Sequence, residues 1–174
     1  MKKIAFICDI HLDEKNPVTY GVDSKKNWEH ILKDVRKRKI DQLVFGGDIG
    51  AATAHDWFFA TLKQFNLKLI IGNHDAYSEV SKHYSTGESP TSLFYTEKEA
   101  SLKFLYLDSS SKKINEDQLN WIAHEIKTKS NLVIFIHHPI LKVDTPIDRK
   151  HPLLNRDEIV ELFVNCIVCP PVGV

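Results

Sequence analysis

The sequence has few of the features that mark secreted or membrane proteins. Its three cysteines, Cys8, Cys166 and Cys169, cannot all pair, and such scarcity is typical of a reducing compartment, here expected to be the cytoplasm. No apolar run approaches the roughly 20 residues that a membrane-spanning helix needs. The run that follows Met1 is too short for a secretory signal and is predicted to be a strand.

An excess of charge of either sign is also missing. Lys+Arg and Asp+Glu both number 23 among 174 residues, so the formal net charge is zero. A general nucleic-acid or membrane surface usually needs excess basic charge, and we therefore expect neither. Cys166-x-x-Cys169 lacks a second cysteine pair, so it is not expected to bind zinc or to act in redox chemistry. Cys8 is expected to be a small buried side chain.

The length and a hydrophobic content of 43% predict one domain with its own core, spanning residues 1–174. Strand-like runs alternate with helical patterns, which is typical of α/β proteins. Helices are expected after Asp23 or Ser24, around 53–65, from near Asn115, and after a cap at Asn155. Strands are expected at 3–8, 41–45, 67–71, 92–96, 102–107 and 132–136, with 92–96 and 102–107 forming an antiparallel hairpin. Residues 76–90 are predicted to be a loop.

The predicted strands end in residues that commonly bind metals. The sequence places Asp-Ile-His at 9–11, Gly-Gly-Asp at 46–48, Gly-Asn-His-Asp at 72–75 and His-His-Pro at 137–139. Because ligands bind at the carboxyl ends of strands in open α/β sheets, we expect these segments to converge. Each segment alone has an ordinary alternative, such as a strand-end cap or an Asx turn. Together, in this order, they indicate a metal site.

The same four motifs resemble the calcineurin-like metallophosphoesterase superfamily. Within it, the chain is most similar to the small bacterial phosphodiesterases that include the class III cyclic-nucleotide enzymes. The resemblance runs from Met1 to about Phe163, and residues 164–174 form a tail that matches nothing expected there. It implies an αββα sandwich, two sheets flanked by helices, with an incomplete second sheet. The segments Leu-Asp-Ser at 107–109 and Gln-Leu-x-Trp at 118–121 fit the same branch.

The resemblance implies a dinuclear centre. Its two divalent ions would be manganese, iron or zinc, because mixed His, Asp and Asn ligands suit several metals. The implied metal ligands are Asp9, His11, Asp48, Asn73 and His137. Asp48 would bridge both ions, and a bridging hydroxide would attack the phosphorus of a small-molecule phosphodiester or phosphomonoester.

Three further residues have implied roles around these metals. His74 would donate to a phosphoryl oxygen or to the leaving group, and Asp75 would orient His74. His138 would contact substrate or support the neighbouring ligand. The remaining histidines are interpreted as surface or satisfied side chains: His30, His55, His83, His124 and His151.

The family's Gly-His-x-His motif, which carries two more metal ligands, does not occur in this sequence. Each metal would then keep three protein ligands, counting Asp48 twice. Two functions therefore stay open. One is a metal-dependent phosphoesterase, and the other is a catalytically impaired or truncated metal-binding or regulatory domain of the same fold. Formation of a homo-oligomer is open as well.

Overall fold

The computed structural model describes residues 2–128 and 130–168. The first sheet is parallel, in the order β1 (Ile4–Ile7), β2 (Gln42–Phe45), β3 (Leu67–Leu69). The second sheet has β5 (Leu102–Tyr106) at its centre, antiparallel to β4 (Tyr95–Glu99) and parallel to β6 (Asn131–Phe135). The predicted antiparallel hairpin is therefore confirmed.

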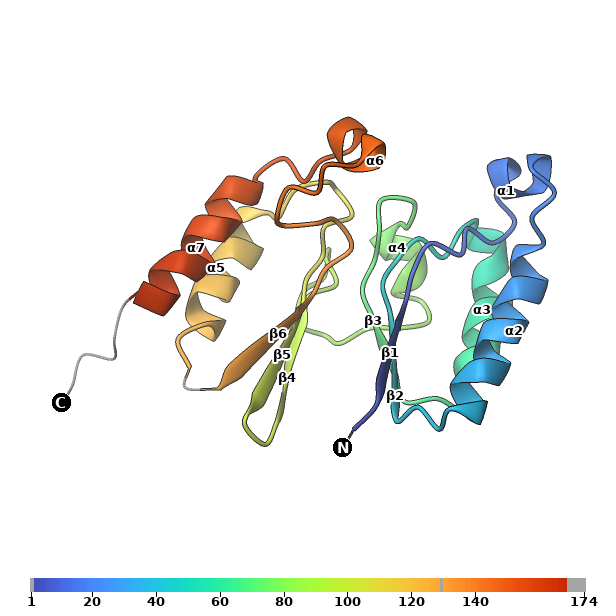
Figure 1. Ribbon diagram of the computed structural model, residues 1–174, viewed down its shortest axis with the longest axis horizontal. Helices are drawn as coiled ribbons and strands as arrows, with labels where there is room; N and C mark the ends of the chain where they lie inside the picture. Colours follow the sequence, from blue (N-terminus) through green and yellow to red (C-terminus); the bar gives the residue numbers. More distant parts are fainter. Residues whose placement is uncertain (1, 129, 169–174) are drawn as a thin grey trace.

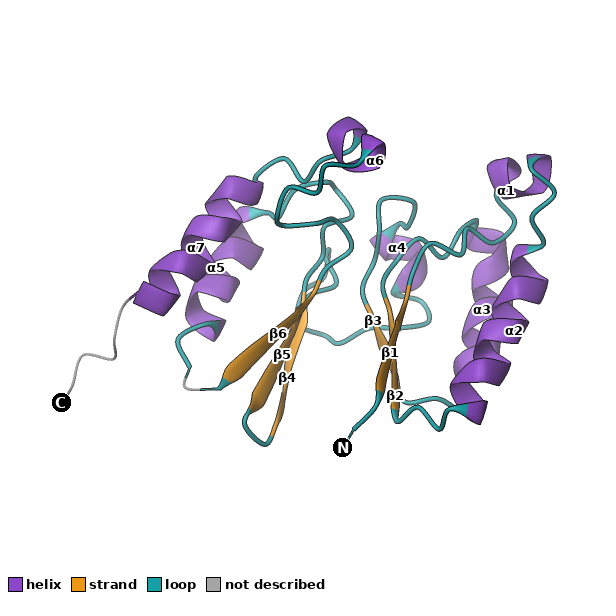
Figure 2. Cartoon of the chain, in the orientation of Figure 1, coloured by secondary structure: helices purple, strands orange, loops and turns teal. Residues whose placement is uncertain are grey.

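The two sheets lie between two layers of helices, as Figure 1 and Figure 2 show. On the outer side of the first sheet lie α2 (Ser24–Lys37) and α3 (His55–Leu62). On the outer side of the second sheet lie α5 (Glu116–Glu125) and α7 (Arg156–Val168). The expected αββα sandwich is confirmed, with three strands in each sheet over the described ranges.

Several short elements were missed by the sequence analysis. They are α1 (Lys15–Thr19), η1 (Ala52–Ala54), α4 (Tyr77–Val80) and α6 (Pro146–Lys150). Helical periodicity needs a window of roughly 11 residues or more, so elements of this length give no signal. The predicted loop at 76–90 consequently contains α4, and the helix expected at 53–65 begins as η1 and ends at Leu62. Within the described part of the chain, no helix has the length and apolar character needed to cross a membrane.

The long helices begin where side chains can cap them. Asp23 accepts a hydrogen bond from the Lys26 N–H at the start of α2, and Asn115 accepts one from the Gln118 N–H at the start of α5. Asn155 precedes α7 as expected, and its amide donates to the Glu158 carboxylate in the first turn at 3.0 Å. The Asn155 side chain also accepts from the Ile114 N–H at 3.1 Å and donates to the Ile114 carbonyl at 3.0 Å, which joins the approaches to α5 and α7.

The prediction for Cys8 was wrong, because this side chain is exposed. It follows β1, which pairs with β2 along one edge and is only partly covered. The cysteine motif at 166–169 extends to Cys169, which lies outside the described residues.

Buried tyrosines join the two sheets. The Tyr95 hydroxyl accepts from the Leu69 N–H at 3.0 Å and donates to the Leu69 carbonyl at 3.1 Å. The Tyr106 hydroxyl accepts from the Gln42 side chain at 3.0 Å, and the two tyrosine rings stack at 4.4 Å. The second sheet thus satisfies backbone groups at the end of β3, close to the loop that carries residues 72–75.

We expect Tyr95→Phe to lower the free energy of unfolding by about 1–3 kcal/mol, the cost of buried polar groups left without a partner. The phenyl ring keeps the stacking on Tyr106, so the change isolates the hydroxyl. Urea denaturation measures the effect. Tyr20→Phe is the control, because Tyr20 is 82% exposed and should give no measurable change. Equal stabilities for both variants would contradict this role of Tyr95.

Candidate metal centre

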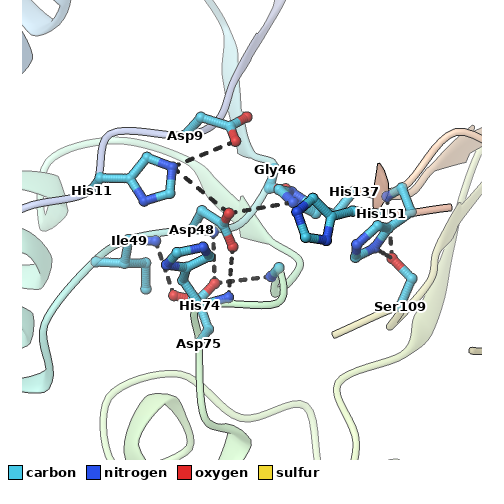
Figure 3. A network of polar contacts seen from close by, with 12 residues as sticks. Asp9, His11, Gly46, Asp48, Ile49, His74, Asp75, Ser109, His137 and His151 are labelled. Carbon is cyan, nitrogen blue, oxygen red and sulfur yellow. Dashed lines mark hydrogen bonds and ion pairs between the residues drawn. The ribbon is translucent and has the colours of Figure 1, made fainter. Parts of the chain in front are cut away.

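The carboxylate of Asp48 is the centre of the site. It lies in the loop after β2, and the residue is only 3% exposed. Its Oδ2 atom lies 3.5 Å from His137 Nε2 and 3.8 Å from His11 Nε2. Figure 3 shows His11 and His137 pointing toward Asp48 from opposite sides. Loops that follow β1, β2 and β6 therefore meet at one carboxylate.

Asp9 completes this group from the end of β1. Its Oδ1 lies 3.7 Å from His11 Nε2. Ligand atoms of Asp9, Asp48 and His137 all lie within 4.8 Å of one another, which is a spacing that one metal ion could span. The structure thus brings together four of the five predicted metal ligands.

Three of these residues have strained backbones. Asp9, His11 and Asp48 have positive φ angles of 59°, 44° and 60°. Such left-handed conformations cost of order 1–3 kcal/mol each for residues other than glycine, and they persist only where the surroundings impose them. Here the loops impose them on one another, because the Asp9 N–H donates to the Gly47 carbonyl at 3.0 Å and the His11 N–H to the Asp48 carbonyl at 3.2 Å.

The imidazoles of His11 and His137 are both held with Nε2 turned toward Asp48. His137 Nδ1 lies 2.8 Å from the Gly46 carbonyl, and His11 Nδ1 lies 3.1 Å from Glu14 Oε2. With Nδ1 donating to these oxygens, Nε2 of each ring is left to face the Asp48 carboxylate. An imidazole oriented by an outer hydrogen bond in this way is the usual arrangement of a metal ligand.

The space beside Asp48 also fits a metal centre. A Cβ atom added at Gly72 would lie 2.1 Å from Asp48 Oδ1 and 2.8 Å from His137 Cε1, so any larger residue would intrude on the ligands. Carboxylate oxygens and imidazole nitrogens are donors that suit divalent manganese, iron and zinc. The residues present therefore fit the ions that the resemblance implies.

The electrostatics of the group favour positive charge. Hydrogen bonding to Asp9 raises the pKa of His11 to about 9, and the same contact with His11 lowers the pKa of Asp9 to about 2. Burial acts to raise the pKa of Asp48, but hydrogen bonds from His137 and from the His74 N–H outweigh it, and the net shift is downward. Both carboxylates are thus kept ionised and attract cations.

The prediction that Asp75 orients His74 is not what the structure shows. Asp75 Oδ2 accepts from the N–H groups of Asp48 at 2.7 Å and Gly72 at 2.9 Å, and its Oδ1 accepts from the Ile49 N–H at 2.9 Å. All these donors belong to backbone on the β2 and β3 loops (Figure 3). Asp75 therefore holds two ligand-bearing loops together, because both of its oxygens are engaged by their backbone N–H groups.

The residue that contacts the His74 ring is Glu14, which the sequence analysis did not single out. Glu14 Oε1 lies 3.1 Å from His74 Nδ1, while its Oε2 bonds His11. The His11 and His74 rings also pack edge to face, with their centroids 4.7 Å apart. Glu14 sits in the loop that precedes α1, outside any strand end, so the pattern used to find the ligands does not point to it.

Of the two roles expected for His138, its position favours support of the neighbouring ligand over substrate contact. His138 is 4% exposed, and its Nδ1 lies 2.9 Å from the Ser109 hydroxyl. Its ring packs edge to face on His137 at 4.9 Å. His138 thus lies behind a proposed ligand and supports it. Asn73 is exposed on the turn after β3, and its role as a ligand stays a prediction.

The other histidines divide into two groups. His30, His83, His124 and His151 are exposed, as expected. His55 is 3% exposed, and neither of its ring nitrogens has a hydrogen-bond partner of normal geometry among the described residues. His55 is therefore a buried side chain, not one of the surface histidines.

With this geometry, the chain can be compared with known proteins. A family model described as calcineurin-like phosphoesterase matches residues 2–165. The chain belongs to the calcineurin-like phosphoesterase family. The superfamily resemblance seen in the sequence is therefore confirmed. A crystal structure of a dimetal phosphatase from Danio rerio has a similar fold, with a TM-score of 0.68 and 12% identity, covering 94% of this chain and 77% of that one.

Two curated relatives carry the name "Probable cyclic nucleotide phosphodiesterase". The one from Fibrobacter succinogenes is 24% identical over 145 residues, which cover 79% of this chain and 57% of the relative. The one from Xenorhabdus bovienii is 24% identical over 182 residues, covering 92% of this chain and 72% of the relative. The calcineurin-like chain thus spans little more than half the length of the first relative.

We expect Asp75→Asn to weaken both the fold and the metal centre. An amide has one oxygen where the carboxylate has two, so at least one backbone N–H on the ligand loops loses its acceptor, at about 1–3 kcal/mol. Thermal unfolding and manganese titration calorimetry measure the two effects. Asp56→Asn is the matched control, since that side chain is 97% exposed. Unchanged stability and manganese affinity in Asp75→Asn would refute this role.

Proposed function

We propose that the chain is a metal-dependent phosphoesterase that hydrolyses small phosphate esters, most directly phosphodiesters. The observation that carries the proposal is the inward Nε2 atom of His11 and of His137, each within 3.8 Å of the Asp48 carboxylate. Membership of the calcineurin-like phosphoesterase family supports this assignment. The names of the two bacterial relatives support a phosphodiester over other esters.

Two divalent cations are proposed as the cofactors. Asp9, His11 and Asp48 would hold one, and Asp48, Asn73 and His137 would hold the other. When bound, such cations supply positive charge that binds a phosphoryl group and acidifies water. Manganese, iron and zinc all suit these donors. The cytoplasmic location and the homo-oligomer stay predictions.

The chain's own residues would position the substrate and move a proton. His74 is 44% exposed at the rim of the site, with Nδ1 turned to Glu14. When the ring is protonated on both nitrogens, Nε2 would be the atom that gives its proton to a phosphoryl oxygen or to the leaving group. Glu14 would fix this orientation, and through its second oxygen it would also fix His11. One carboxylate thereby orients a metal ligand and a proton donor together.

Hydrolysis of bis(p-nitrophenyl) phosphate with added manganese tests the function. We expect turnover that Asp48→Asn lowers by more than about 100-fold, because changes to residues that only support a ligand already cost 10–100-fold. Metal content and thermal unfolding of the variant show whether the fold is retained. Manganese binding without turnover in the unaltered chain would instead indicate a metal-binding domain that is not catalytic.

We expect Glu14→Gln to lower kcat by about 10–100-fold while the chain stays folded. The amide cannot accept from both imidazoles as strongly as a carboxylate, so His11 and His74 lose their common anchor. Steady-state kinetics with the same substrate measures the loss. Asp56→Asn is the control, because the Asp56 side chain is 97% exposed. Equal kcat values for both variants would exclude Glu14 from this role.

A further inference from the structure

A cavity of about 410 Å³ opens directly beside the metal centre. One side of its lining belongs to the centre itself and includes Asp9, His11, Glu14 and His74. All the carboxylate and imidazole side chains of the lining lie on this side. The cavity falls within the roughly 300–1,000 Å³ typical of small-molecule sites, so it has room for more than a phosphate group.

The opposite side comes from α1 and the turn that follows it. Pro17, Tyr20 and Val22 form an apolar surface here. Tyr20 is 82% exposed and Val22 is 45% exposed, so this surface faces solvent. Single exposed apolar residues are ordinary, but these line a cavity that begins at the proposed metal ligands. An aromatic ring in such a place offers a flat surface on which a planar group can stack.

Polar groups without charge complete this side. The Asn16 amide and the Ser24 hydroxyl also line the cavity. An amide offers both donors and an acceptor, and a hydroxyl offers both as well. The cavity therefore has a charged half suited to a phosphate and its metals, and a neutral half suited to a planar, hydrogen-bonding group.

The apolar surface on α1 and the following turn is held in place by backbone hydrogen bonds. The Tyr20 N–H donates to the Asn16 carbonyl at 3.1 Å, and the Val22 N–H donates to the Pro17 carbonyl at 2.9 Å. The Lys25–Asp13 ion pair at 2.8 Å joins the start of α2 to the loop before α1. A ligand would thus meet a preformed surface, and little binding free energy would be spent on ordering it.

We propose that the surface made by Asn16, Pro17, Tyr20, Val22 and Ser24 binds the nucleobase of a nucleotide phosphodiester, with Tyr20 as the stacking residue. This inference rests on the proposed function, because it names the organic part of the substrate whose phosphate the metal centre would take. Tyr20 is then a residue that determines specificity and takes no part in the chemical step.

Two esters with the same leaving group test the subsite: thymidine 5′-(p-nitrophenyl) phosphate and methyl p-nitrophenyl phosphate, both with manganese. We expect Tyr20→Ala to lower kcat/KM for the thymidine ester about tenfold, within the range measured for loss of base stacking. The value of kcat/KM for the methyl ester should be unchanged. Tyr20→Phe should retain the activity on the thymidine ester, because a phenyl ring still stacks. An equal effect of Tyr20→Ala on both esters, or on neither, would overturn the proposal.

Val18→Ala is the matched control, since Val18 is 68% exposed on α1 but does not line this cavity. Val18→Ala should leave kcat/KM for both esters unchanged. A tenfold loss of kcat/KM in this variant would show that any change in α1 disturbs the site. If the unaltered chain hydrolyses neither ester, the proposed function fails. The subsite is then judged by calorimetry with adenosine 5′-monophosphate and manganese. Weaker binding by Tyr20→Ala supports it, and equal binding by both chains overturns it.

Discussion

The side chain of Asp75 is the constraint on which the metal centre depends. Its carboxylate accepts three backbone N–H groups, two from the loop after β2 and one from the loop after β3. These bonds hold Asp48 in its left-handed conformation, with its carboxylate turned to the histidines. Burial raises the pKa of Asp75, while the three N–H groups favour its charged form. Burial lowers the pKa of His55, so this nearby imidazole is favoured in its neutral form.

The ligand positions could be predicted because they follow directly from strand periodicity. Asp9, His11, Asp48 and His137 all come within a few residues of a strand end, and the carboxyl ends of the parallel strands point to one edge of the molecule. The motifs also identified the family, and with it the sandwich. The starts of two long amphipathic helices could be predicted as well, α2 after Asp23 or Ser24 and α5 near Asn115.

The roles of Asp75 and Glu14 could not be predicted, because both depend on pairings between distant segments. Asp75 looks like an orienting partner for its neighbour His74, yet its bonds reach back to 48 and 49. Glu14 reaches a histidine 60 positions along the chain. Short-range spacing cannot show either contact. The burial of His55 and the exposure of Cys8 likewise depend on how the layers pack and which strand edge is covered.

Glu14 also ties the metal centre to the surface proposed for the nucleobase. It lies immediately before α1, whose residues and following turn form that surface, and its carboxylate contacts both His11 and His74. A shift of α1 would therefore move the proposed stacking ring and the two imidazoles together. A change that displaces α1 should therefore alter how a phosphate is placed against His74, whereas a change confined to the Tyr20 ring should alter only which organic group is bound. The backbone of residues 14–22 thus connects specificity to catalytic geometry, while the side chains on it keep separate roles.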